Sequence, residues 1–233
     1  MQRLLRLIQH PHTRHWLWVA LATFLIGGFI IVSTEIREAQ AGQSETIVAI
    51  DQVVLKTLVG LRNPGLNGVS VDVTALGSGT VLSLLTTCLV LFTYFQRRYF
   101  LALHIFSAGA GAGLLTHFLK HHFGRSRPDA LFQLVEVQGF SYPSGHSMAS
   151  AAVYFTLAIV FCSQFKSKLP RLIIGALFVL IIFSIGASRM YLGVHYFSDV
   201  LAGILIGISW ASLLTGLSSY VSIRKLRRSM ARA

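Results

Sequence analysis

Residues 172–188 read LIIGALFVLIIFSIGAS, an apolar stretch without a single charged side chain. A helix needs roughly 20 apolar residues to cross a hydrocarbon core about 30 Å thick, so this stretch has nearly the length of a membrane span. Similar stretches recur along the chain, and the full set is 16–34, 73–95, 99–119, 147–165, 172–188 and 198–221. The sequence therefore predicts an all-α, polytopic membrane protein whose six transmembrane helices form one bundle.

The composition supports this fold class. Of the 233 residues, 54% are hydrophobic and only 12% are charged, whereas soluble domains carry about 25% charged residues. No repeat or domain boundary interrupts the pattern, so we expect residues 1–233 to form a single membrane-embedded domain. In the longest connection, 35–72, residues 47–61 space apolar side chains like a helix with a narrow polar face. This segment is expected to lie along the membrane surface, and 62–68 (RNPGLNG) to form a turn before the second span.

Charged residues distribute unevenly between the two predicted faces. Lys and Arg near membranes collect on the cytoplasmic side, and the six spans place thirteen of the twenty basic residues on the face that holds both termini. All eight carboxylates fall on the opposite face. We therefore expect a multi-pass protein of a bacterial plasma membrane, with cytoplasmic termini and a first helix retained as a signal-anchor. The short, compact chain is the reason for the bacterial assignment.

The basic C-terminal tail raises the question of a nucleic-acid partner. Because the tail directly follows a membrane span, topology and attraction to anionic membrane lipids explain it more simply. We expect no nucleic-acid partner. Cys88 and Cys162 both fall inside predicted spans, and we infer neither a disulfide nor a metal site from them.

Three polar segments adjoin helix ends at the outer face. They are KHHFGRSRP at 120–128, PSGH at 143–146 and SRMYLGVHYFSD at 188–199. One bundle could bring them together. Lys120, Arg127 and Arg189 would then supply cationic groups for a phosphate.

The segment 143–146 has the features of an anion cradle. Proline begins a turn, and Gly145 lets the backbone approach a ligand closely. The following helix directs unpaired N–H groups and its positive dipole end outward, and Ser144 adds a hydroxyl donor. The sequence thus predicts a phosphate site at this helix start.

Two histidines add what an anion site alone does not need. Asp199 follows His195 by four residues, so the two share one face if the segment is helical. A carboxylate on one ring nitrogen fixes the tautomer and leaves the other nitrogen free to attack. His146 can then donate a proton to the departing oxygen. This set predicts phosphoryl transfer with His195 as nucleophile, Asp199 as its partner and His146 as acid.

The combined pattern resembles the signature of the type-2 phosphatidic acid phosphatase superfamily. Eleven fixed positions agree in order, namely Lys120, Arg127, Pro128, Pro143, Ser144, Gly145, His146, Ser188, Arg189, His195 and Asp199. The resemblance implies a metal-independent phosphatase without a cofactor, which acts through a phosphohistidine on His195. It also implies that Lys120, Arg127, Ser144, Gly145 and Arg189 hold the phosphate. Membrane members dephosphorylate lipids such as phosphatidate, phosphatidylglycerophosphate, isoprenyl pyrophosphates and lipid A.

One arginine, two histidines and a set of glycines can each be interpreted in more than one way. Arg125 is either a solvated flank or a further phosphate contact. His117 and His121 have the spacing of a metal-binding pair, although packing among polar partners is the expectation for His117. Glycines at 77, 79, 109, 111 and 113 are expected to let helices approach closely, rather than to cradle phosphate.

Two alternative functions compete with hydrolysis. A lipid phosphotransferase would share the covalent step on His195 and pass the phosphoryl group to another lipid. A transporter would instead place charged residues inside the spans, and here the middles of the spans lack charge. The outer-face site favours carriers exposed in the outer leaflet, such as an isoprenyl pyrophosphate.

Overall fold

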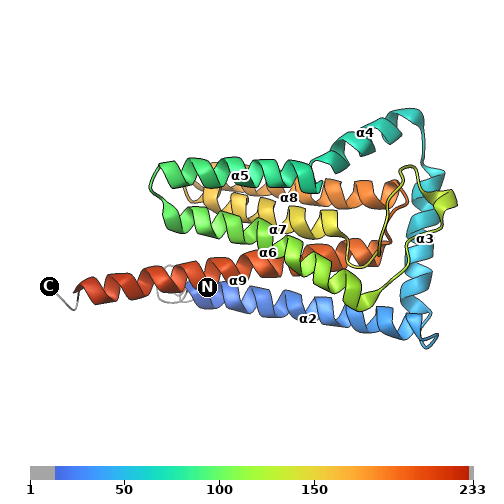
Figure 1. Cartoon of the computed structure of the whole chain (residues 1–233), viewed down its shortest axis with the longest axis horizontal. Helices are drawn as coiled ribbons and strands as arrows, with labels where there is room; N and C mark the ends of the chain where they lie inside the picture. The colour runs from blue at the N-terminus through green and yellow to red at the C-terminus, as the bar shows by residue number, and fades with distance from the viewer. Residues whose placement is uncertain (1–13, 231–233) are drawn as a thin grey trace.

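The protein is a helical bundle, described by a computed structural model over residues 14–230 with side chains over 15–221 (Figure 1). The described residues contain no β-strand. The helices are α2 (Arg14–Gln40), α3 (Thr46–Gly60), α4 (Pro64–Ala75), α5 (Gly79–Phe95), α6 (Tyr99–Phe123), the 3₁₀ turn η1 (Ala130–Phe132), α7 (Gly145–Cys162), α8 (Lys168–Tyr191) and α9 (Phe197–Met230). The predicted all-α class is confirmed.

Five helices, α2, α6, α7, α8 and α9, are individually long and apolar enough to cross a membrane. The sixth span is the pair α4 and α5, which is bent by 40° at the break between the two helices. The protein is therefore an integral membrane protein with the expected layout. The observed helices extend beyond most of the predicted stretches, because polar residues at their ends continue the helical hydrogen bonding.

The prediction of one continuous helix over 73–95 was wrong. The chain leaves the helix after Ala75, and Ser78 starts a new one by accepting the N–H of Val81 at 3.2 Å. The predicted turn over 62–68 was also wrong beyond Asn63. The Asn63 side chain caps α4 by accepting the N–H of Leu66, and Pro64 occupies the first turn, where its missing N–H costs nothing.

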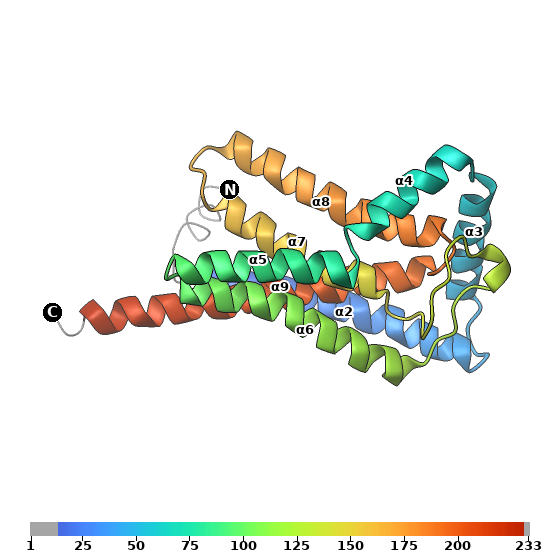
Figure 2. The same cartoon turned by 45° about the horizontal axis from the view of Figure 1, so that its top comes forward.

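The centre of the bundle lies where α7 meets α5, α8 and α9. Buried side chains of these helices form one apolar cluster, which includes Leu82, Tyr154, Ile185 and Val200. Gly203 on α9 allows a very close approach of α7, because a Cβ there would lie 2.7 Å from the carbonyl oxygen of Ser144. The start of α7 is thus seated directly on α9. Figure 2 shows both helices running through the bundle.

Helix α3 crosses the end of the bundle (Figure 1). The predicted helix over 47–61 is confirmed, but one of its polar side chains is buried and does not face water. Asp51 is 1% exposed and lies among the buried residues of α3 with Ile47 and Leu55. This helix therefore brings a buried carboxylate to the end of the bundle that carries the three polar segments.

The prediction that glycines allow close approach of the helices holds at three of the five positions and fails at two. A Cβ at Gly77, Gly109 or Gly111 would press against Ile185, Thr86 or Trp210 respectively, as close packing requires. Gly79 and Gly113 have no such neighbour, so they are not packing contacts. The two cysteines are free, Cys88 being exposed and Cys162 partly buried.

Candidate active site

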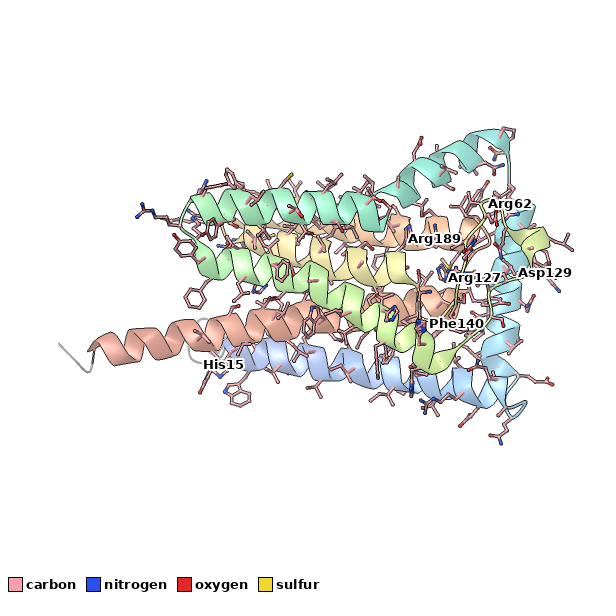
Figure 3. All side chains as sticks on the ribbon, in the orientation of Figure 1. His15, Arg62, Arg127, Asp129, Phe140 and Arg189 are labelled. Atoms are coloured by element: carbon pink, nitrogen blue, oxygen red, sulfur yellow. The ribbon has the colours of Figure 1, made fainter. Side chains whose placement is uncertain are left out.

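The three polar segments meet at the end of the bundle where α3 lies (Figure 3). Backbone hydrogen bonds join the segments 143–146 and 188–199, and also their flanking loop. The N–H of Ser144 donates to the carbonyl of Asp199 at 2.9 Å, and the N–H of Leu134 donates to that of Leu192 at 2.9 Å. The loop between α6 and α7 is thereby fixed against the loop between α8 and α9. The two loops hold the candidate residues in one place.

His195 lies in the loop before α9, with both ring nitrogens engaged. Nδ1 is 3.2 Å from Ser141 Oγ and 3.4 Å from Asp199 Oδ2. Nε2 is 3.1 Å from a guanidinium nitrogen of Arg127. Arginine has no acceptor, so Nε2 must accept and the proton of the neutral ring sits on Nδ1. The lone pair of Nε2 therefore points toward the cations.

The surroundings of His195 keep its ring neutral. Burial lowers the pKa of His195 to about 3, Asp199 opposes this shift, and Arg127 and Arg189 add to it. A protonated ring has no lone pair with which to attack. Burial and the neighbouring cations thus favour the neutral imidazole, which has a lone pair on Nε2.

Asp199 is completely buried and makes contacts through both carboxylate oxygens. Ser141 Oγ donates to Oδ2 at 2.5 Å, and the backbone N–H of Tyr196 donates to the same oxygen at 2.9 Å. Ser141 was not predicted, since a serine in a loop has no distinguishing pattern. Its hydroxyl lies between Asp199 and His195 and ties the pair to the loop before α7.

Two of the predicted cations are held by loop carbonyls. Lys120 Nζ donates to the carbonyl of Phe140 and, at 3.4 Å, to that of Ser141. Arg127 donates to Gly139 O at 2.9 Å and to Val194 O at 2.8 Å. Burial lowers the pKa of Arg127, and Asp199 opposes the shift. Lys120 and Arg127 therefore donate hydrogen bonds to uncharged carbonyl groups and form no ion pair with any described residue.

Arg189, at the end of α8, is 3% exposed. One terminal nitrogen donates to Thr74 Oγ1 at 3.0 Å, whereas Nε has no hydrogen-bond partner among the described residues. A buried donor without a partner costs about 1–3 kcal/mol. An anion next to Arg189 would remove that cost.

The segment predicted to cradle phosphate lies at the start of α7. Ser144 is fully buried and caps the helix, its Oγ accepting the N–H of Ser147 at 3.4 Å and the hydroxyl of Ser147 at 3.0 Å. A contact from Ser144 to phosphate therefore stays a prediction. Gly145 packs against α6, where a Cβ would lie 3.1 Å from Thr116 and 3.7 Å from Lys120 Cε.

His146 is half-buried at the same helix start. It lies close enough to His195 and to the cations of Lys120, Arg127 and Arg189 to interact with them electrostatically. The bend between α4 and α5 passes beside it, since a Cβ at Gly77 would lie 3.5 Å from the ring. All eight predicted site residues therefore belong to one cluster.

Arg125 is neither a solvated flank nor a free phosphate contact, which corrects both sequence interpretations. Its guanidinium forms ion pairs with Asp199 and with Asp51, each at 2.7 Å. Burial lowers the pKa of Arg125, but the two carboxylates outweigh burial and hold it above its usual value. Asp51 was not predicted either, because the sequence offers no sign that a carboxylate of the connecting helix reaches the site.

The histidines of α6 do not behave as predicted. His117 is exposed and meets the ring of His121 at 4.4 Å between centroids, rather than packing among polar partners. Within the described part of the chain, no three His, Cys, Asp or Glu side chains are placed to share a metal ion. His10 and His12 lie outside the described residues, and His15 contacts the rings of Trp16 and Tyr220.

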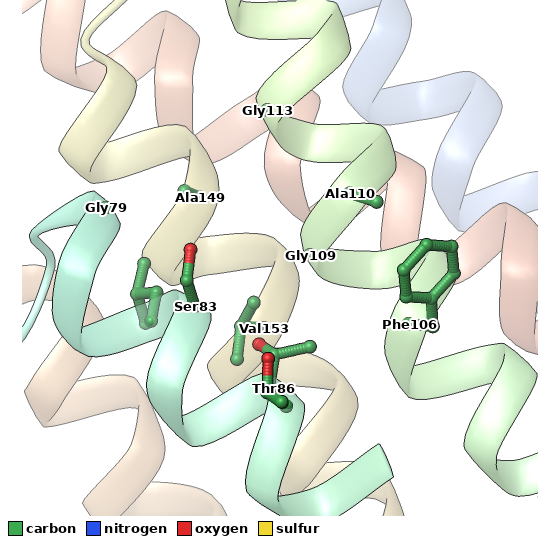
Figure 4. A pocket seen from close by; sticks show the side chains of 11 residues that line it. Gly79, Ser83, Thr86, Phe106, Gly109, Ala110, Gly113, Ala149 and Val153 are labelled. Carbon is green, nitrogen blue, oxygen red and sulfur yellow. The ribbon is translucent and has the colours of Figure 1, made fainter. Parts of the chain in front are cut away.

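A groove of about 310 Å³ lies beside the cluster, between α5, α6 and α7 (Figure 4). Its walls are mostly apolar or small and include Gly79, Leu82, Phe106, Gly109, Gly113 and Val153. Ala149, which follows His146 by three residues, lies at its α7 wall, so the groove starts about one helical turn from His146. Gly79 and Gly113, which press against no other helix, leave this space open.

Comparisons with known proteins agree on one family. A model of the PAP2 superfamily matches residues 100–222. Phosphatidylglycerophosphatase B of Bacillus subtilis is 34% identical over 184 residues, which cover 76% of this chain and 88% of that protein. The lipid A 1-phosphatase of Rhizobium etli is 33% identical over 123 residues, covering 49% of this chain and 48% of that protein.

A solved structure shows the same fold. The crystal structure of a transmembrane PAP2-type phosphatidylglycerolphosphate phosphatase from Bacillus subtilis superposes with a TM-score of 0.75 at 29% identity. The match covers 84% of this chain and 94% of that one.

Proposed function

Because this chain belongs to the PAP2 superfamily and is an integral-membrane phosphatase, we propose that it removes a terminal phosphate from a membrane lipid through a phosphohistidine on His195. The observation that carries the proposal is the orientation of the His195 ring. Nδ1 is held by Asp199 and Ser141, and the lone pair of Nε2 points toward the cations. This is the arrangement that an attacking imidazole requires.

The reaction takes place in two balanced steps. Nε2 of His195 attacks phosphorus while the bond from phosphorus to the lipid oxygen breaks, and His146, which carries a proton on both ring nitrogens at the start of this step, gives one of them to that oxygen. His146 then removes a proton from a water molecule, whose oxygen attacks the phosphohistidine and releases inorganic phosphate and His195. Asp199 stabilises the positive charge that the ring carries in the intermediate.

The cations compensate the negative charge of the transferring group. Lys120, Arg127 and Arg189 bind its oxygens, together with the backbone N–H of Gly145 and the hydroxyl of Ser144. Phosphoryl transfer depends mainly on such positioning and charge stabilisation. Bound phosphate also satisfies the partnerless Nε of Arg189.

The lipid chain occupies the groove between α5 and α6, next to His146. The groove is lined mostly by apolar or small side chains, which suits the hydrocarbon chain of a lipid. The relatives are named for phosphatidylglycerophosphate and lipid A, which join isoprenyl pyrophosphate and phosphatidate as candidates.

The site faces the periplasm or the exterior. The turn after α5 carries Arg97 and Arg98, and the turn after α7 together with the first residues of α8 carries Lys166, Lys168 and Arg171, all at the end of the bundle away from α3. The positive-inside rule assigns that end to the cytoplasm. The substrate is then a lipid of the outer leaflet.

Phosphate release from the four candidate lipids by purified protein tests the proposal. His195→Ala should abolish turnover and the acid-labile ³²P label on the protein, and EDTA should leave the wild type active. Near-normal turnover in the folded variant would refute the covalent scheme. Release without any acceptor lipid would separate hydrolysis from transfer to a second lipid.

A further inference from the structure

We propose that Asp51 and Arg125 are positioning residues for the reaction, which hold Asp199 in place from outside the signature. The inference rests on the proposed roles of His195 and Asp199. Neither residue belongs to the eleven signature positions, and Asp51 lies outside the 100–222 region that the family model matches.

The contacts form a continuous chain from α3 to the nucleophile. Arg125 joins the two carboxylates, with 2.7 Å from one terminal nitrogen to Asp199 Oδ1 and 2.7 Å from the other to Asp51 Oδ2. The remaining oxygen of Asp199 faces His195 and Ser141. Arg125 therefore determines which oxygen of Asp199 is available to the imidazole.

Ser198 fixes the far end of the chain. Its backbone N–H donates to Asp51 Oδ1 at 2.9 Å and its hydroxyl donates to Oδ2 at 2.6 Å. The same hydroxyl accepts from Arg125 at 2.7 Å. Since Ser198 directly precedes Asp199, Asp51 is tied both to the guanidinium and to the backbone that carries the catalytic carboxylate.

The guanidinium of Arg125 is held in place by these contacts and by an aromatic ring. Its guanidinium lies over the ring of Tyr196, with 4.4 Å from Cζ to the ring centroid, and its side chain is 11% exposed. Ion pairs to two carboxylates are stronger than contacts to carbonyls, so Arg125 cannot turn toward phosphate as Lys120 and Arg127 can. A phosphate-binding role is thereby excluded for it.

The charges explain why both residues are needed. Without Arg125, two buried carboxylates, Asp51 and Asp199, would lie close together with no cation between them, which is costly in a buried site. Without the charge of Asp51, one guanidinium nitrogen would lose its anion and Arg125 could move away from Asp199. Either change misaligns the Asp199 carboxylate with His195, while the phosphate-binding cations stay in place.

The test is Asp51→Asn, which keeps the size of the side chain and removes its charge, with Glu45→Gln as control. Glu45 precedes α3, is exposed and makes no side-chain cap bond. We expect kcat of Asp51→Asn to fall about tenfold or more, as for other groups that orient a functional histidine. The inhibition constant of inorganic phosphate, which occupies the anion pocket without bonding to His195, should stay within about twofold of wild type. Glu45→Gln should match wild type in both.

A double-mutant cycle with Arg125→Gln tests the connection. If both residues act through Asp199, the double variant should lose little more kcat than the more impaired single variant. Wild-type kcat in both single variants, or fully additive losses, would overturn the proposal.

Arg125→Lys decides the case if Asp51→Asn does not fold. A lysine keeps the charge but lacks the fork that reaches two carboxylates, so kcat per folded molecule should fall with an unchanged inhibition constant for inorganic phosphate. A wild-type kcat, or a loss of kcat matched by weaker phosphate binding, would overturn the proposal. His195→Ala is assayed in parallel. If it is inactive while these variants resemble wild type, only this inference fails; if it is active, the proposed function fails.

Discussion

Replacing Gly203 with alanine should lower kcat, although none of the residues proposed to bind phosphate lies on α9, the helix that carries Gly203. The new Cβ would lie 2.7 Å from the carbonyl oxygen of Ser144, 3.0 Å from Ser147 Cβ and 3.1 Å from the nitrogen of Met148. Two of these three atoms belong to the backbone of α7, so no side-chain rotation can relieve the overlap. The start of α7 must move away from α9 by roughly half an ångström or more to restore ordinary contact.

That displacement moves His146 and the phosphate cradle relative to His195, because the two groups sit on opposite sides of the α7–α9 contact. A misplacement of about 1 Å can cost 10²-fold in rate, so we expect kcat to fall by about tenfold or more. Overpacking a core costs about 1–3 kcal/mol, and the temperature of unfolding in detergent should fall as well.

Gly175→Ala is the matched control. Gly175 lies within α8, and a Cβ there meets nothing within 4 Å. Alanine is favoured over glycine in a helix by about 1 kcal/mol, so this variant should keep wild-type kcat and unfold no earlier than wild type. Phosphate release and thermal unfolding of the two variants give the comparison. Wild-type values for Gly203→Ala, or equal losses in both variants, would refute the reasoning.

Two further predictions concern the acid and the membrane side. His146→Ala should slow release of an alkoxide by roughly 10²–10⁴-fold, the usual effect of a general acid, and a nitrophenolate leaving group, which needs no proton, should partly restore the rate. Absence of any recovery would assign His146 to phosphate binding instead. A cysteine at Gln138, an exposed residue of the loop between α6 and α7, should react with a membrane-impermeant maleimide in intact cells if that loop faces outward as proposed. Labelling only after the membrane is opened would invert the topology.

The fold and the location of the site could be predicted from the sequence because both depend on local features. Uncharged stretches near the length of a span identify the helices. Short polar segments that adjoin the outer ends of those spans must lie at one membrane face. The structure confirms the helices and brings the three segments together, since their loops are joined by backbone hydrogen bonds.

The break between α4 and α5 could not be predicted because it depends on tertiary contacts. The stretch around Gly77 carries no charge and lies within a longer uncharged run, although residues 77–79 read Gly-Ser-Gly. What permits the break is the neighbouring structure. Gly77 leaves room for Ile185 and His146, and the hydroxyl of Tyr154 donates to the carbonyl of Leu76 at 2.8 Å, which satisfies an acceptor that the interrupted helix leaves open.

The roles of the outer basic residues depend on acceptors that are distant in the sequence. Arg125 and Arg127 are two residues apart, yet Arg125 meets two carboxylates whereas Arg127 meets carbonyls and His195. Arg62 is likewise held, by the carbonyls of two loops that it joins. An incoming phosphate dianion competes well with a neutral carbonyl but poorly with a carboxylate already paired at 2.7 Å. Because Arg125 is already neutralised by its two ion pairs, we expect Lys120, Arg127 and Arg189 to be the cations that bind phosphate.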